Sequence, residues 1–267
     1  MDRKAIFHLT NPIHSALPWK LCAALLLLST SLLCSCSYSH GQAKILNEAD
    51  EKNASNEANK TSVAPEAGKA VESEKKAELF DGVNHISMFD GETLGSWEIA
   101  DIYHNGNVYV KDGCMILEKS DYMTGVKWTG PLINMNYDIS FEAMRVEGDD
   151  FFAALTFPVG KRSCSLILGG WHNTVNGLSS VDNKDASLNE TTLRFGLESN
   201  RWYKVDLRVT SDRIQALLNG EWIVDVDTTG KNIDIRIECI PCEPLGFATY
   251  MTTGAIRNIR MAKLMEQ

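Results

Sequence analysis

The sequence has little positive charge for its length: 26 lysine and arginine residues stand against 35 aspartate and glutamate residues, a formal net charge of −9. Nucleic-acid binding depends on lysine and arginine that neutralise phosphates, so this composition excludes nucleic acid as a partner. It equally disfavours an electrostatic grip on an anionic membrane surface. If the protein is held at a membrane, we expect a covalent lipid to hold it.

A membrane-spanning run is also lacking. The apolar stretch at residues 21–33 follows Arg3, Lys4 and Lys20, but it is too short to cross a bilayer core, which takes about 20 helical residues. A positive leader followed by a short apolar run is typical of a secretory signal peptide, which we place at residues 1–35. The alternative is an uncleaved hydrophobic anchor, which would leave the rest of the chain on the same side of the membrane.

The apolar run ends in Leu33-Cys34-Ser35-Cys36, which resembles a lipoprotein processing box. Cleavage favours a small residue just before the modified cysteine. Cys36, preceded by Ser35, is therefore the predicted lipidation site, and Cys34, preceded by bulky Leu33, is the alternative. Ser37 in the next position resembles the pattern of outer-membrane sorting, so we expect a lipid-anchored protein of the cell envelope, at the outer membrane or facing the periplasm.

Aromatic residues are missing from residues 39–79, where Asn, Glu, Lys, Ala and Ser dominate. Such a stretch cannot bury enough apolar surface to offset its ordering entropy. We therefore interpret residues 36–82 as a lipidated, flexible linker that carries a globular domain at residues 83–267.

Long helical patterns are absent from this domain, and short runs with a period of two replace them. In residues 137–146, Tyr137, Ile139 and Phe141 share one face of an expected strand. Strong hairpin signals are Asn219-Gly220 and Asp112-Gly113, because a type I′ turn needs positive φ at both positions. Repeated short strands of this kind predict an all-β, two-layer antiparallel sandwich. Further expected strands are residues 151–157, 163–168, 202–209, 233–239 and 255–261.

Blocks spread over the whole domain resemble one known family, the 3-keto-disaccharide hydrolase domain family. Its members are similar to the concanavalin A-like jelly-roll sandwiches. The blocks are Phe89-Asp90-Gly91-Glu92-Thr93-Leu94 followed by Trp97, then VKDGCMIL, YDISFEAMRV, NRWYKVDLRVTSDRIQALLNGEWIVDVD and GAIRNIRM.

The resemblance implies action on glycosides that carry a ketone at carbon 3. Such a ketone acidifies the proton on carbon 2, so a single carboxylate or histidine base can drive loss of the glycosidic oxygen. The paired carboxylates of ordinary glycosidases are then not needed. The middle of this chain departs from the family pattern, so no catalytic residue is carried over from the family.

Candidate site residues therefore come from the middle segment itself. Gly169-Gly170 makes a sharp loop after an apolar strand and is followed by Trp171 and His172. Trp171 is a candidate to stack on a sugar ring, and His172 is a candidate base or hydrogen-bond partner. The alternative is a tryptophan that caps the core beside an exposed histidine.

The oxygen-rich loop at residues 177–192 follows. Asp185 and Glu190 are candidate general bases, and Arg194 and Asp182 are candidate contacts to substrate. A second interpretation gathers Asp182, Asn183, Asp185 and Glu190 around Ca²⁺, which prefers six to eight oxygen ligands. A third treats them as turn-forming side chains. No other cofactor or metal is expected.

Two polar pairs and the cysteines complete the candidates. We expect Asp149-Asp150 at the tip of a hairpin, with the alternative that the pair faces the same groove as the site. We expect Lys161-Arg162 in a solvated turn, with Arg162 a candidate sugar contact. Cys239 and Cys242 are spaced to close a small disulfide ring in an oxidising compartment. Cys114 and Cys164 are expected as buried thiols in strands.

Three functions remain open: an exported hydrolase or lyase acting on 3-keto disaccharides, a non-catalytic carbohydrate-binding module, and a laminin-G-like adhesive domain. The enzyme predicts a groove in which a carboxylate or histidine with a raised pKa lies near an arginine and an aromatic ring. The binding module predicts exposed aromatic rings without such a base.

Overall fold

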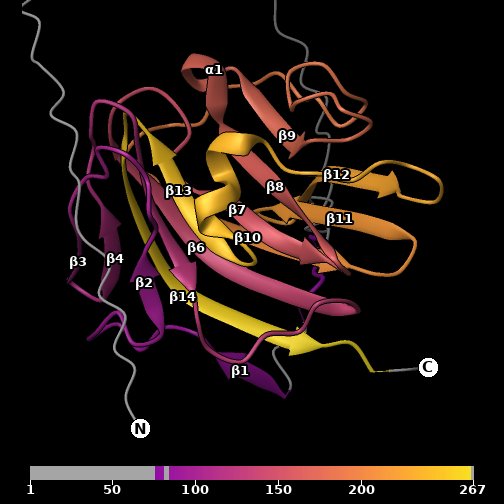
Figure 1. Ribbon diagram of the computed structural model, residues 1–267, viewed down its shortest axis with the longest axis horizontal. Helices are drawn as coiled ribbons and strands as arrows, with labels where there is room; N and C mark the ends of the chain where they lie inside the picture. The colour runs from indigo at the N-terminus through magenta and orange to yellow at the C-terminus, as the bar shows by residue number, and fades with distance from the viewer. Residues whose placement is uncertain (1–75, 81–83, 266–267) are drawn as a thin grey trace, which may run out of the picture. The chain divides into compact units, whose positions relative to one another are not determined.

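The computed structural model describes residues 76–80 and 84–265, and strands dominate this part of the chain (Figure 1). A large sheet contains eight strands in the order β12-β11-β10-β6-β14-β4-β3, with β1 also paired to β14. A small sheet contains six, in the order β2-β5-β13-β7-β8-β9. Every strand pairing among the described residues is antiparallel.

The large sheet consists of β1 (His85–Ser87), β3 (Val108–Lys111), β4 (Cys114–Leu117), β6 (Tyr137–Glu147), β10 (Tyr203–Val209), β11 (Arg213–Leu218), β12 (Glu221–Asp227) and β14 (Thr253–Lys263). The small sheet consists of β2 (Trp97–Ile99), β5 (Met123–Trp128), β7 (Ala154–Val159), β8 (Arg162–Gly169), β9 (Val175–Ser179) and β13 (Gly246–Tyr250). The two short helical segments are α1 (Gly170–Asn173) and η1 (Ile237–Cys242).

The core lies between the two sheets and follows the predicted period of two. Tyr137, Ile139 and Phe141 of β6 are buried, and the Phe141 ring packs edge-on against Phe247 of β13 at 4.9 Å between centroids. Trp97 packs on the same Phe247 ring. The predicted all-β, two-layer antiparallel sandwich is confirmed.

Both predicted hairpins are present. Asn219 and Gly220 join β11 to β12 with φ of 50° and 82°, and Asp112 and Gly113 join β3 to β4 with φ of 51° and 74°. Positive φ at two consecutive positions is what a type I′ turn requires, and Asn, Asp and Gly tolerate it best.

The outer face of the large sheet is covered by the end of the predicted linker. Leu79 and Phe80 are buried there, Arg208 donates to the Leu79 carbonyl at 2.8 Å, and the Arg260 guanidinium lies 4.9 Å from the Phe80 ring centroid. Residues 76–80 therefore pack on the sandwich, so chain packing begins before the predicted boundary at residue 83.

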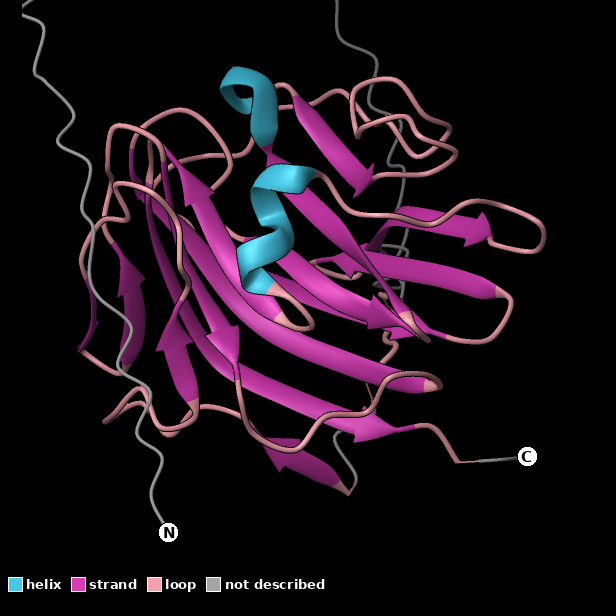
Figure 2. Ribbon diagram, in the orientation of Figure 1, coloured by secondary structure: helices cyan, strands magenta, loops and turns pink. Residues whose placement is uncertain are grey.

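The helical segment η1 lies on the outer face of the small sheet (Figure 2), where glycine and alanine positions let it approach closely. A Cβ added to Gly125 would lie 2.7 Å from a side-chain carbon of Ile102 and 3.0 Å from Cys242 Sγ. One added to Gly246 would lie 2.5 Å from the Cys242 carbonyl oxygen. With Ala154 and Ala248 on the same face, these positions leave room for a second, smaller apolar cluster outside the sandwich core.

The strand predicted at residues 233–239 is wrong. Ile233 forms only an isolated bridge with Val181, and Ile237 begins η1, where its side chain is 77% exposed. Ile233 is buried and Ile235 packs against the second apolar cluster, whereas Ile237 is exposed, so the alternating isoleucines do not share one strand face. Cys239 and Cys242 instead face the small sheet three residues apart, the repeat of a 3₁₀ helix.

The hairpin tip predicted at Asp149-Asp150 is also wrong. β6 belongs to the large sheet and β7 to the small sheet, so the chain at these residues crosses from one layer to the other. A two-residue polar break between apolar strands is compatible with a hairpin within one sheet and with a crossing between the two sheets. Only the assignment of each strand to a sheet distinguishes the two connections.

The predicted signal peptide, Cys34, Cys36 and most of the predicted linker lie outside the described residues. Within the described ranges, no helix is long and apolar enough to cross a membrane.

Candidate functional site

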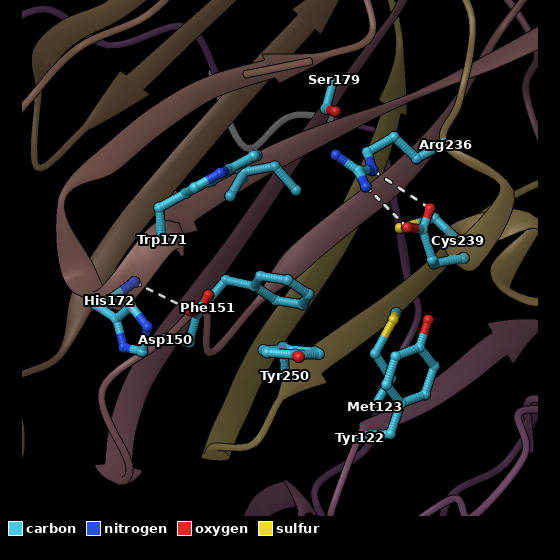
Figure 3. A pocket seen from close by; sticks show the side chains of 12 residues that line it. Tyr122, Met123, Asp150, Phe151, Trp171, His172, Ser179, Arg236, Cys239 and Tyr250 are labelled. Atoms are coloured by element: carbon cyan, nitrogen blue, oxygen red, sulfur yellow. Dashed lines mark hydrogen bonds and ion pairs between the residues drawn. The ribbon is translucent and has the colours of Figure 1, made fainter. Parts of the chain in front are cut away.

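A cavity of about 340 Å³ opens on the outer face of the small sheet, between the α1 turn and η1 (Figure 3). We call it the β8–η1 cavity. Segments far apart in the sequence line it: the start of β5, the crossing between β6 and β7, the end of β8, α1, η1 and the end of β13. These ends are brought together by the sheet order, in which β5, β13, β7 and β8 are neighbours.

The floor of the cavity is aromatic. The Phe151 and Tyr250 rings lie 5.8 Å apart at 32°, and Tyr122 meets Tyr250 edge-on at 5.7 Å. Figure 3 shows Phe151 and Tyr250 in the middle of the site, with Trp171 above them. Flat apolar faces of this kind suit the carbon–hydrogen faces of a sugar ring.

One wall is a left-handed turn at the end of β8. Gly169, Trp171, His172 and Asn173 have φ of 69°, 50°, 53° and 62°, a conformation that costs energy for L-residues and that clusters at functional sites. The His172 amide donates to Asp150 Oδ2 at 3.0 Å. The turn places both the Trp171 and the His172 side chains along the cavity.

The His172 imidazole is paired with a carboxylate. Its Nδ1 lies 3.0 Å from Asp149 Oδ2. Because a carboxylate only accepts, Nδ1 is the donor, which leaves Nε2 of the neutral ring as the acceptor. This hydrogen bond, with the charges of Asp149 and Asp150, raises the pKa of His172, while the same bond lowers the pKa of Asp149. The imidazole side chain is 83% exposed, so a ligand can reach it.

The opposite wall carries Arg236 and Glu238. Arg236 Nη2 donates to Glu238 Oε1 at 2.8 Å, and its Nη1 donates to Asp185 Oδ2 at 3.1 Å. The hydrogen bond to Glu238 raises the pKa of Arg236 and lowers that of Glu238. The cavity thus has an imidazole with two carboxylates on one side and a guanidinium on the other.

The structure brings only some of the predicted site residues together. Trp171 and His172 line the β8–η1 cavity. Asp185 reaches it only through Arg236, since its Oδ1 accepts hydrogen bonds from the Ser187 amide and hydroxyl.

The remaining candidates lie elsewhere. Glu190 pairs with Lys231 and lines a separate cavity of about 270 Å³ beside β12. Asp182 Oδ1 accepts from the Asn232 amide, and Arg194 donates to the Ser187 carbonyl. Arg162 donates to Asn232 and Ile233 and lines a third cavity, next to residues 132–134. These four candidate residues therefore do not line the β8–η1 cavity.

The calcium interpretation of the oxygen-rich loop is corrected in the same way. Asp182, Asp185 and Glu190 turn to three different partners, as turn-forming and ion-paired side chains do. Among the described residues, no three His, Cys, Asp or Glu side chains are grouped to hold a metal ion.

The cysteines are all free thiols in the described part of the chain, so the disulfide between Cys239 and Cys242 is not formed. Cys114 and Cys164 lie in strands β4 and β8, as predicted. Burial raises the pKa of Cys239 to about 11 and that of Cys164 to about 12, so these groups stay protonated and unreactive.

Sequence reasoning missed Arg236, Glu238 and Tyr122 as cavity residues. It placed Asp150 at a hairpin tip, and the alternative that this residue faces the groove agrees with its place in the cavity lining. Arg236 and Glu238 lie in the alternating run at residues 233–239, which was interpreted as a strand. Tyr122 precedes β5 with no local signal.

Comparison with known proteins identifies the family. The sequence model of the 3-keto-alpha-glucoside-1,2-lyase-like domain matches residues 84–262. The chain therefore belongs to this carbohydrate-active family, and the family resemblance seen in the sequence is confirmed. No curated protein matches the chain.

Solved structures with a similar fold are distant in sequence. Carbohydrate-binding module CBM66 from Bacillus subtilis is 11% identical with a TM-score of 0.43, over 62% of this chain and 96% of that one. The Crh5 transglycosylase in complex with NAG is 8% identical with a TM-score of 0.47, over 70% of this chain and 86% of that one.

Proposed function

We propose that the β8–η1 cavity binds glycosides oxidised to a ketone at carbon 3 and cleaves their glycosidic bond by elimination. The observation that carries this proposal is the pairing of His172 with Asp149 at a cavity edge that faces Arg236 across an aromatic floor. It matches the arrangement expected of the enzyme: a histidine with a raised pKa, an arginine and aromatic rings in one groove. Family membership supports the substrate class.

In the proposed reaction, His172 Nε2 takes the proton from carbon 2 of the oxidised sugar. The carbon–hydrogen electron pair becomes the double bond between carbons 1 and 2. The bond from carbon 1 to the glycosidic oxygen breaks, and that oxygen keeps the electron pair and takes a proton. The products are a free sugar and an unsaturated 3-keto sugar, and addition of water across the new double bond completes a hydrolysis.

Other cavity residues supply the remaining roles. Arg236 donates to the carbon-3 oxygen, on which negative charge develops as the proton leaves. Tyr122, which also lines the cavity, protonates the departing oxygen. Trp171 and Tyr250 hold the sugar ring by their apolar faces.

The test is to incubate the full chain with 3-keto-trehalose in D₂O and to follow free glucose together with loss of the carbon-2 proton signal by NMR. We expect both, and neither with unoxidised trehalose, whose carbon-2 proton is not acidified. Release of glucose without any exchange or loss of that proton would contradict elimination.

A carbohydrate-binding module is the second candidate function. It is favoured by the ion pairs of Arg236 with Glu238 and Asp185. These pairs already neutralise the charge of Arg236, which the proposed reaction would use to stabilise the carbon-3 oxygen. Absence of turnover together with a 3-keto-trehalose-dependent rise in the melting temperature would establish this alternative.

We also propose that the chain is exported and lipidated at Cys36, on the support of the Leu33-Cys34-Ser35-Cys36 sequence after a short apolar run. Mass spectrometry of the N-terminal peptide from membrane fractions tests this. Cys36→Ala should abolish the diacylglycerol adduct, whereas Cys34→Ala should retain it.

A further inference from the structure

Arg145 is an arginine in a core position. It continues the inward-facing row of β6 that begins with Tyr137, Ile139 and Phe141, since these residues are separated by steps of two. Its exposed fraction is 2%, and its Nε has no hydrogen-bond partner among the described residues. A buried guanidinium without an ion pair is costly, so its retention calls for a reason beyond packing.

The guanidinium reaches from the large sheet to the left-handed turn that follows β8 of the small sheet. Its Nη2 donates to Asn173 Oδ1 at 2.6 Å and its Nη1 donates to the Leu197 carbonyl at 3.2 Å. Its carbon CZ lies 5.1 Å from the Phe152 ring centroid, within cation–π range. A Cβ on Gly169 would approach Nη2 to 2.5 Å, so that glycine also provides space for the guanidinium.

Asn173 is the point at which this contact meets the turn. Its φ is 62°, its Oδ1 also accepts from the Leu197 amide at 2.8 Å, and its Nδ2 donates to the Leu197 carbonyl at 3.0 Å. Arg145 and Asn173 thus clamp the same backbone residue. The two residues just before Asn173 are Trp171 and His172. Their left-handed conformation costs energy and must be stabilised by contacts with the surrounding structure.

We infer that Arg145 is a positioning residue, which clamps Asn173 and thereby holds the left-handed turn that presents His172 and Trp171 to the β8–η1 cavity. The expected effect of Arg145 on catalysis rests on the proposed function. Its stabilisation of the left-handed turn does not, because the hydrogen bonds belong to the fold. Arg145 contacts neither the cavity nor the His172 ring, so it acts on them through Asn173 and the turn, and through its charge, which, after the hydrogen bond from His172, contributes to the lowered pKa of Asp149.

The test compares Arg145→Met with Arg260→Met. Arg260 is a matched control, because its Nε is likewise buried without a partner and its guanidinium likewise lies over a phenylalanine, on the outer face of the large sheet. The primary measurement is the His172 pKa by NMR titration of the full chain labelled in histidine, with the signal assigned by His172→Gln. The second is the fluorescence of Trp171, read as the difference from Trp171→Phe.

For Arg145→Met we expect the His172 pKa to fall towards that of a free histidine, about 6.5, because the turn no longer keeps the ring on Asp149. We expect kcat on 3-keto-trehalose to fall by about tenfold to a hundredfold, with a smaller change in KM, as is usual for a misplaced reacting group. Arg260→Met should change none of these. Arg145→Lys should also show a lowered His172 pKa and kcat, because a single ammonium group cannot reproduce the planar geometry with which Arg145 donates to both Asn173 and Leu197.

If Arg145→Met fails to fold, Asn173→Gly replaces it. Glycine accepts positive φ without strain but lacks the side chain that Arg145 clamps, so the same fall in the His172 pKa is expected. An unchanged His172 pKa and unchanged Trp171 fluorescence in the folded variant overturn the inference. Absence of turnover in the unmodified chain overturns the proposed function instead, because the NMR titration does not depend on turnover.

Discussion

The two outer faces of the sandwich both carry charged side chains, but they are covered in different ways. On the large sheet, Arg208 holds Asp138 in a bidentate pair at 2.8 and 2.7 Å, and Leu79 and Phe80 cover the face. On the small sheet, small residues admit η1, whose Arg236–Glu238 pair stands beside a cavity. In this sandwich, ion pairs thus lie under a covering segment on one outer face and beside an open cavity on the other.

The sharpest way to break this comparison is to remove the proposed base. His172→Gln should lower turnover of 3-keto-trehalose by about 10²- to 10⁴-fold, the usual contribution of a general base. Steady-state kinetics of glucose release measures this.

Glu190→Gln is the matched control, since Glu190 came from the same sequence prediction but lies in the separate cavity beside β12. Its activity should stay within about twofold, because exposed surface substitutions change little. Equal losses of turnover in His172→Gln and Glu190→Gln would show that the β8–η1 cavity is not the site of the reaction.

The next largest effect compares one arginine from each outer face. Arg236→Met should cost about a hundredfold in kcat, because it removes the donor to the developing oxyanion. Arg257→Met on the large sheet breaks the pair with Glu142 at 2.7 Å and the stacking on Trp202, and should leave kcat unchanged. A comparable loss of kcat in Arg257→Met would mean that the outer faces are not functionally separate.

Much of the fold was predictable because its signals are local. Asn219-Gly220 and Asp112-Gly113 specify their turns by backbone chemistry alone, and the period of two in residues 137–146 follows the pleat of a half-buried strand. Asp149-Asp150 was not predictable, since a change of sheet depends on contacts that are distant in sequence.

The site was predictable only where the sequence marks a loop. Trp171 and His172 follow a glycine pair, whereas Arg236 and Glu238 lie in an alternating run that imitates a strand. Arg145 did leave a signal, because an arginine in phase with the apolar face of a strand is rare without a partner. Extending the inward row of β6 by two steps would have identified it.

A smaller effect is expected from the cover of the large sheet. Phe80→Ala should lower the free energy of unfolding by about 2 kcal/mol, the value of burying a phenylalanine side chain, and leave kcat on 3-keto-trehalose unchanged. Denaturant titration and steady-state kinetics measure the two quantities. A large loss of activity at full folding would show that residues 76–80 influence the opposite face.

The smallest effect is a displacement of the pH profile. His172 acts as a base only when it is deprotonated, so kcat/KM should fall as the pH drops through its pKa, which Asp149 raises. Asp149→Asn removes the carboxylate charge, so the His172 pKa should fall and the acid limb should move to lower pH, with a several-fold lower plateau because a weaker base remains. Glu147→Gln is the control for general charge effects, since Glu147 pairs with Lys119 and does not contact His172. An acid limb that stays in place in Asp149→Asn would assign proton abstraction to another group in the cavity.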